Sequence, residues 1–197
     1  TSVYLHSNGQ RELEAEIAGG SVVSLDGSRI LVGAPETARA FVFAPGPPDV
    51  YGRRELSLEQ EMLGSDTFGA AVALSSSTVL VGQPGTASDT GHVAVYGFDG
   101  NEWVAQDRIV SPDSIAGDRF GASIALDGPR VVIGAPGRRH AEGTYGDAYV
   151  FELATDGWQA QATLNAPGQE GRFGHAVALD GGRLLVGAPR LTLLDNA

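Results

Sequence analysis

The 197-residue chain contains no cysteine, and aromatic residues make up only 7% of it. Without cysteine the fold cannot use disulfides, and no metal site can have thiolate ligands. Cations are also scarce, since 13 Lys and Arg against 24 Asp and Glu give a formal net charge of −11 at pH 7. With no basic run in the sequence, we expect no binding to nucleic acid. We also expect no membrane insertion, because no apolar run approaches the roughly 20 residues of a membrane-spanning helix.

Glycine and proline, by contrast, are abundant, with 28 and 10 residues respectively. They separate short apolar runs, a pattern typical of an all-β fold with many tight turns. The clearest example is Phe120–Pro136, in which the runs Ser123–Leu126 and Val131–Ile133 flank the turn pair Asp127-Gly128. This stretch predicts a β-hairpin.

The same hairpin recurs along the chain, opened by Phe-Gly and closed by Gly-x-Pro. Further copies run over Phe68–Pro84 and Phe173–Pro189, and a degenerate copy over Gly19–Pro35 lacks the phenylalanine. A period of about 50 residues in a β-type sequence predicts propeller blades, each a four-stranded antiparallel sheet. We expect the motif rings to fill the wedge between blades, the glycines to allow close backbone approach and the prolines to end strands. These structural residues are Phe68, Gly69, Gly82, Pro84, Phe120, Gly121, Gly134, Pro136, Phe173, Gly174, Gly187 and Pro189.

The two chain ends together predict one further blade. A second hairpin follows the first in each unit, whereas Val3–Ile17 has the pattern of a second hairpin alone and Phe173–Pro189 that of a first hairpin alone. We therefore expect one propeller domain over residues 1–197, a monomeric ring in which Val3–Ile17 pairs beside Leu184–Val186. The expected blades cover residues 19–63, 64–110, 116–164, and 173–197 together with 1–18. The alternative is a homodimer whose two chains exchange termini and form an eight-blade ring.

The repeated units resemble FG-GAP repeats, the unit of the integrin α-subunit N-terminal propeller. The segments Ser88–Tyr96 and Ala116–Gly121 are most similar in style to bacterial extracellular FG-GAP proteins. The resemblance implies a β-propeller, usually of seven blades, that is extracellular, on the cell surface or periplasmic. It also implies a loop face that binds ligands. Because the chain opens on Thr1 without a visible signal peptide, we expect a mature or excised domain.

The loops that carry calcium in several integrin repeats are short turns in this sequence. Those at Asp26, Asp127 and Asp180 offer one carboxylate each, whereas Ca²⁺ takes six to eight oxygen ligands. We therefore expect these aspartates to be turn residues, and we expect no bound metal and no other cofactor. A site that this reasoning misses would form where Asp89, Asp113 and Asp118 converge.

The sequence contains no catalytic motif of a known type. It has no HExxH, no GxSxG and no P-loop, and its four histidines follow no catalytic spacing. We therefore expect no enzymatic activity. Two rival functions remain open, a purely structural repeat module of a larger secreted protein and a hydrolase or hydrolase-accessory domain.

The loop after the third Gly-x-Pro, Gly137–Asp147, is the longest of its kind and holds the clearest candidate site. We predict that it binds a ligand through Arg138, Arg139, His140 and Tyr145, because guanidinium and aromatic groups together suit carboxylate or sugar ligands. The inter-blade loops Ser111–Asp118 and Asn165–Arg172 are expected beside it. The alternative is a solvated loop in which the arginines only balance charge. The favoured function is a non-catalytic, integrin-like adhesion propeller that presents these loops to an extracellular protein or glycan.

Overall fold

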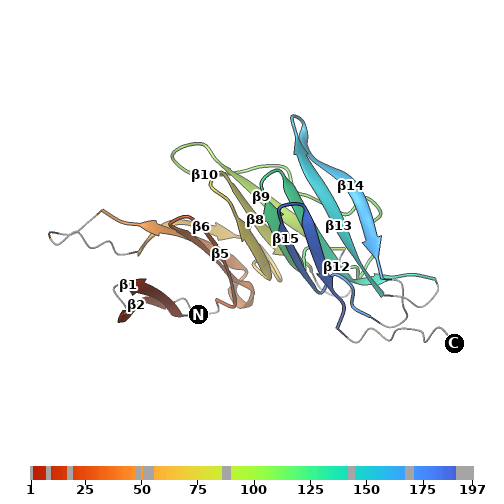
Figure 1. Cartoon of the computed structure of the whole chain (residues 1–197), viewed down its shortest axis with the longest axis horizontal. Coiled ribbons are helices and arrows are strands. Elements are labelled where there is room, and N and C mark those ends of the chain that lie inside the picture. The colour runs from red at the N-terminus through yellow and green to blue at the C-terminus, as the bar shows by residue number, and fades with distance from the viewer. Residues whose placement is uncertain are drawn as a thin grey trace.

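The computed structural model describes residues 2–7, 10–16, 20–47, 50, 56–85, 90–141, 145–166 and 171–189. Over these residues the chain is all-β, with sixteen strands and one short 3-10 turn, η1 (Pro35–Thr37). The strands form five antiparallel sheets that follow one another along the molecule (Figure 1). No helix in the described part is long and apolar enough to cross a membrane.

Three of the sheets have four strands each and correspond to the predicted complete blades. In all three the strands are hydrogen-bonded in sequence order, as in a propeller blade. The first sheet consists of β3 (Val22–Asp26), β4 (Arg29–Ala34), β5 (Arg39–Pro45) and β6 (Leu56–Leu63). The second consists of β7 (Ala71–Leu74), β8 (Thr78–Gln83), β9 (His92–Phe98) and β10 (Trp103–Ala105). The third consists of β11 (Ser123–Asp127), β12 (Arg130–Arg139), β13 (Tyr145–Ala154) and β14 (Gly157–Asn165).

The predicted hairpin over Phe120–Pro136 is confirmed. Strands β11 and β12 pair from Ser123 opposite Gly134 to Asp127 opposite Arg130. The turn between them needs the left-handed conformation that glycine supplies, and Gly128 has φ of 54°. The same hairpin forms in each of the other repeats, since the pairs β3–β4, β7–β8 and β15–β16 are all antiparallel.

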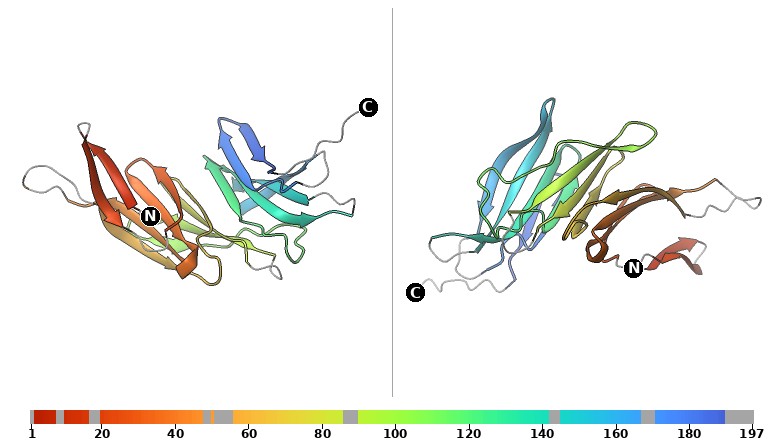
Figure 2. Two further views of the ribbon diagram at one scale, coloured as in Figure 1. Left: turned by 90° about the horizontal axis from the view of Figure 1, so that it is seen from below. Right: turned by 180° about the vertical axis from the view of Figure 1, so that it is seen from behind.

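The two chain ends form separate two-stranded sheets, and the predicted ring closure is not present. Strand β1 (Ser2–Ser7) pairs with β2 (Gln10–Glu16), and β15 (Ala176–Asp180) pairs with β16 (Arg183–Gly187). Val3 pairs with Ala15 and not with the strand that holds Leu184–Val186, while Ile17 lies outside the described residues. Figures 1 and 2 show the two hairpins toward opposite ends of an open arc.

The core lies between successive sheets, where the motif glycines approach the neighbouring backbone as predicted. The expectation that the motif prolines end strands is wrong for Pro136, because β12 continues through it to Arg139. Phe68 and Phe120 are buried in the wedges before the second and third sheets, while Phe173, at the edge of the last hairpin, is only half-buried. The glycine of each interior Gly-x-Pro lies against the backbone of the next repeat. A Cβ added there would overlap a carbonyl oxygen of the following Phe-Gly glycine, in the pairs Gly33 with Gly69, Gly82 with Gly121, and Gly134 with Gly174.

Candidate ligand-binding site

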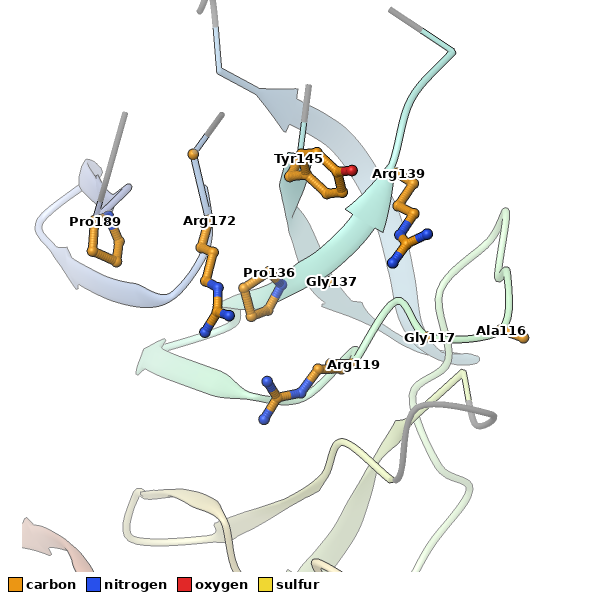
Figure 3. A pocket seen from close by; sticks show the side chains of 10 residues that line it. Ala116, Gly117, Arg119, Pro136, Gly137, Arg139, Tyr145, Arg172 and Pro189 are labelled. Carbon is orange, nitrogen blue, oxygen red and sulfur yellow. The ribbon is translucent and has the colours of Figure 1, made fainter. Parts of the chain in front are cut away.

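A hollow of about 620 Å³ lies at the loop end of the third sheet, beside the β15–β16 hairpin. Its walls come from three segments, namely the inter-blade loop before Phe120, the end of β12 with the start of β13, and the residues around the last hairpin (Figure 3). The lining residues are Ala116, Gly117, Arg119, Pro136, Gly137, Arg139, Tyr145, Gly171, Arg172 and Pro189.

Two close backbone contacts bring these walls together. Gly137 donates a hydrogen bond from its N–H to the carbonyl of Asp118 at 3.0 Å, and a Cβ at Gly137 would overlap the carbonyl oxygen of Gly117. On the other side, Gly146 has φ of 91°, and a Cβ there would overlap the carbonyl oxygen of Phe173. Glycine is required at both places, so the sequence fixes how the loops meet around the hollow.

Three arginines line the hollow, and among the described residues no carboxylate does. Arg119 and Arg172 each stand directly before a Phe-Gly motif, so they occupy equivalent positions in two successive repeats. Figure 3 shows their guanidinium groups directed toward one another near Pro136, with Arg139 on the far side of Gly137. Within the described ranges none of the three forms an ion pair, and neither do Arg108 and Arg183, whereas the arginines at 29, 39, 130 and 138 do. On a chain of net charge −11, this is a local concentration of positive charge.

Tyr145 adds an aromatic wall to the hollow. The Cζ atom of Arg139 lies 5.7 Å from the centroid of the Tyr145 ring, within the range of a weak cation–π contact. Both side chains are exposed, so this contact orders them with little loss of access to solvent. A ring beside guanidinium groups can stack on the apolar face of a sugar while the cations bind its acidic substituents.

Arg138 does not line the hollow, which corrects the expectation that it is an exposed ligand-binding residue. Strand β12 continues through Arg139, so the neighbouring side chains at 138 and 139 point to opposite faces. The Arg138 side chain is only 10% exposed and turns inward. It donates from Nη1 to Asp118 Oδ2 at 2.9 Å and from Nη2 to Asp113 Oδ2 at 2.8 Å. Nη1 also bonds to the Asp113 carbonyl.

A second part of this network joins the inter-blade loop to β13. Tyr149 donates from its hydroxyl to Asp113 at 2.8 Å and lies 3.3 Å from Asp147, while His140 Nε2 lies 2.8 Å from Asp147 Oδ1. Burial raises the pKa of the Tyr149 phenol, and its hydrogen bond to Asp113 adds to that rise. Burial alone would raise the pKa of Asp113, but hydrogen bonds from Tyr149 and Ser111 and the charge of Arg138 outweigh it and lower that pKa. The network therefore fixes the two strands and the loop that carry Arg119, Arg139 and Tyr145.

The site thus combines predicted and unpredicted residues. Of the residues predicted to bind a ligand, Arg139 and Tyr145 line the hollow, whereas His140 is not among its lining residues and contacts Asp147. The inter-blade loops do lie beside the β12–β13 loop, although residues 167–170 are outside the described part. Arg119 and Arg172 were missed. Their equivalent positions before successive Phe-Gly motifs were the signal that could have found them.

The described residues contain no cluster of three metal-ligating side chains with an open centre. Asp113 and Asp118 do converge, as the sequence suggested, but on the guanidinium of Arg138, which fills the space between them. Asp89, the third carboxylate of that suggestion, lies outside the described residues.

Comparison with known families identifies one of the repeats. Residues 103–151, from the start of β10 into β13, match the family model described as FG-GAP repeat. The chain therefore contains an FG-GAP repeat and has the character of a β-propeller-like repeat module, as the resemblance implied. The matched segment includes the whole network around Arg138, together with Arg119, Arg139 and Tyr145. No curated protein matches the chain.

Proposed function

We propose that this chain is a non-catalytic binding domain of an extracellular or cell-surface adhesion protein, and that its arginine-lined hollow recognises the anionic group of a partner. The observation that carries this proposal is the convergence of Arg119, Arg139 and Arg172 on one hollow without carboxylate partners among the described residues. Guanidinium groups recognise a carboxylate, sulfate or phosphate through bidentate contact with a pair of its oxygen atoms. The FG-GAP character of the chain supports a role in presenting loops.

An acidic glycan fits the hollow better than a small inorganic anion does. The lining combines three cations with the Tyr145 ring and two prolines, Pro136 and Pro189. The apolar surfaces offer contact area to a sugar ring, which an inorganic ion cannot use. An acidic protein segment would use the same cations, and its binding is a separate outcome of the experiment below.

The test is titration of the purified chain with heparin oligosaccharides and oligogalacturonate, with neutral dextran as the reference. We expect micromolar to millimolar binding of one acidic glycan and a steep loss of affinity with added salt. The single variants Arg119→Ala and Arg172→Ala should each weaken binding by about tenfold, because each substitution removes a charge-assisted hydrogen bond to the ligand. Binding of an acidic peptide in place of both glycans would identify a protein partner.

A matched control lies on the same strand as Arg139. Arg130 begins β12, six residues before Pro136, and does not line the hollow. Its side chain is 53% exposed and lies 3.7 Å from Glu152. Arg130→Ala changes the net charge as the other variants do, so it should leave glycan affinity unchanged. Equal losses in Arg130→Ala and Arg172→Ala would show non-specific attraction and would contradict a site. A wild-type chain that binds neither glycan nor peptide would favour the structural-module alternative.

The hydrolase alternative rests on one observation, the contact of His140 with the buried carboxylate of Asp147. A His–carboxylate pair is two thirds of a nucleophilic triad. Among the described residues, however, no hydroxyl is hydrogen-bonded to His140, and the pair serves the network around Tyr149. Fluorogenic ester and glycoside substrates test this alternative directly. Turnover that His140→Ala abolishes would establish it.

A further inference from the structure

Arg119 has a backbone conformation that arginine rarely adopts. Its φ is 59°, in the left-handed region that glycine adopts freely and other residues adopt at a cost. Hydrogen bonds fix the backbone on both sides of it. The carbonyl of Asp118 accepts from the N–H of Gly137 at 3.0 Å. The N–H of Phe120 donates to the carbonyl of Thr90, also at 3.0 Å. Since glycine would avoid the strain, the backbone does not explain an arginine here, and the place of its side chain in the hollow points to a function.

The position before each Phe-Gly motif can be compared in three successive repeats, where it holds Thr67, Arg119 and Arg172. In each repeat its carbonyl accepts a hydrogen bond from the N–H three residues later, at 2.9 to 3.2 Å. The hydroxyl of Thr67 accepts a hydrogen bond from the N–H of Gly85 at 2.9 Å, so it serves the fold. The guanidinium groups of Arg119 and Arg172, by contrast, have no hydrogen bond or ion pair within the described ranges.

A smaller hollow of about 420 Å³ occupies the equivalent place one repeat earlier. Its walls come from the loop before Phe68, the end of β8, the start of β9 and the segment after β10. Asp66 and Arg108 both line it, so its wall carries charges of both signs. The concentration of arginines is therefore a property of the larger hollow and not of every wedge between sheets.

Arg119 and Arg172 reach the larger hollow from different segments of the chain. The stem of Arg119 lies on the backbone of Gly137, since its Cγ would be 3.1 Å from a Cβ added there. Figure 3 shows the two guanidinium groups directed toward one another near Pro136. Two like charges in this arrangement repel one another, and an anion between them removes the repulsion. An anion that contacts both groups must present oxygen atoms in two directions.

Anionic groups differ in the number of oxygen atoms that they can present. A carboxylate has two oxygens in one plane, and bidentate contact with a single guanidinium uses both of them. A sulfate or phosphate ester has three free oxygens in a tetrahedral arrangement, so a single ester group can contact two guanidinium groups through different oxygens. The opposed arginines therefore suit a tetrahedral anion better than a planar one.

We propose that Arg119 and Arg172 together bind one tetrahedral oxyanion, the sulfate or phosphate ester group of a glycan. This inference rests on the proposed function and narrows its ligand, because it places a glycan ester above a uronate of the same charge. The Tyr145 ring then contacts the sugar that carries the ester. Arg139, on the far side of Gly137, contacts a second anionic group of the same glycan.

Derivatives of one sugar test this preference. Glucose 6-sulfate and glucuronate each carry one negative charge on the same carbon, and they differ in the geometry of the anionic group. We expect glucose 6-sulfate to bind at least about fivefold more tightly than glucuronate in NMR titrations up to about 50 mM, with glucose as the uncharged reference. Glucose 6-phosphate is the third ligand, and the tighter of the two esters identifies the kind of glycan.

The variant Arg119→Gly separates the role of the side chain from the strain of the backbone. Because glycine adopts a positive φ freely, the melting temperature should rise by about 2 °C, while the affinity for glucose 6-sulfate should fall by about tenfold. Arg119→Lys keeps the charge but loses the planar fork, so the preference for the sulfate should shrink to about twofold or less. Arg108→Ala is the matched control. It removes an exposed arginine of the smaller hollow and should leave affinity and preference unchanged.

Three results would overturn the proposal. Equal affinities for glucose 6-sulfate and glucuronate would exclude a tetrahedral preference, yet the proposed function would stand, since the hollow would still bind acidic sugars. Absence of binding by both esters at about 50 mM would also exclude it, and the titration with oligogalacturonate would then decide whether the acidic-glycan site survives. A fall of several degrees in the melting temperature of Arg119→Gly would show that the arginine serves the fold and not a ligand.

Discussion

Arg138 and Asp118 form a buried ion pair, with Nη1 of the arginine 2.9 Å from Oδ2 of the aspartate. The Asp118 side chain is 1% exposed and also accepts a hydrogen bond from the N–H of Ile115. The pair lies behind the arginine-lined hollow and links its inter-blade wall to β12. One arginine therefore supports the site from within, while its neighbour Arg139 faces the solvent.

We predict that Arg138→Ala destabilises the fold by about 3 kcal/mol, because it leaves the buried carboxylate of Asp118 without its cation. Arg139→Ala is the matched control and should change the free energy of unfolding by less than about 0.5 kcal/mol, since its side chain is exposed. Urea denaturation followed by tryptophan fluorescence measures both. Similar midpoints for the two variants would contradict the assignment of Arg138 to the interior.

Arg29 is predicted to hold the first two sheets together. It makes a two-pronged ion pair with Glu59, at 2.8 and 2.9 Å, and its Cζ atom lies 4.3 Å from the Phe98 ring of the second sheet. We expect Arg29→Ala to cost about 1–2 kcal/mol of stability. Arg29→Lys should recover less than half of this loss, because an ammonium group cannot reproduce the planar contacts.

The control for Arg29 is Arg130, which occupies the same position in the third repeat. Arg130 approaches Glu152 only to 3.7 Å, with both side chains exposed, so Arg130→Ala should be nearly neutral. Thermal melts of the two alanine variants under identical conditions measure the difference. A loss of stability in Arg130→Ala equal to that in Arg29→Ala would mean that the ring contacts of Arg29 contribute nothing.

Tyr149 is predicted to make the fold sensitive to alkali. Its pKa is raised in the folded chain by burial first and by its hydrogen bond to Asp113 second, whereas an unfolded tyrosine ionises near pH 10. Above about pH 10 the unfolded state therefore loses a proton that the folded state keeps, and the free energy of unfolding falls as the pH rises. Below pH 10 this contribution is fully present.

Tyr149→Phe removes the ionisable group and should flatten this alkaline decline, although the lost hydrogen bond to Asp113 lowers stability at neutral pH by about 1 kcal/mol. Denaturation midpoints at a series of pH values from neutral to strongly alkaline give the two slopes. Parallel slopes for wild type and variant would assign the alkaline sensitivity to other groups.

The repeats could be predicted from the sequence because their determinants are local. The turn at Asp127-Gly128 and the apolar alternation on either side of it specify a hairpin without reference to the rest of the chain. The convergence of Arg119 and Arg172 could not be predicted in this way, since it depends on how two repeats stack. The prediction that Arg138 is an exposed loop residue was wrong for a different reason. Strand β12 runs past Pro136 to Arg139, and the pattern of the loop gave no sign of it.

The last prediction concerns calcium, to which the stability of the chain should be indifferent. Turn aspartates such as Asp127 supply one carboxylate each, and the one place where several carboxylates meet is filled by the guanidinium of Arg138 among the described residues. A calcium ion there would have to displace the buried guanidinium of Arg138 and break its hydrogen bonds. The free energy lost in this way exceeds what coordination by a few exposed carboxylates would gain. Melting temperatures in millimolar calcium and in EDTA should agree within about 1 °C, because a ligand stabilises a fold only in proportion to its binding. A rise of several degrees in calcium would reveal a site, and its persistence in Asp113→Asn would place that site away from Arg138.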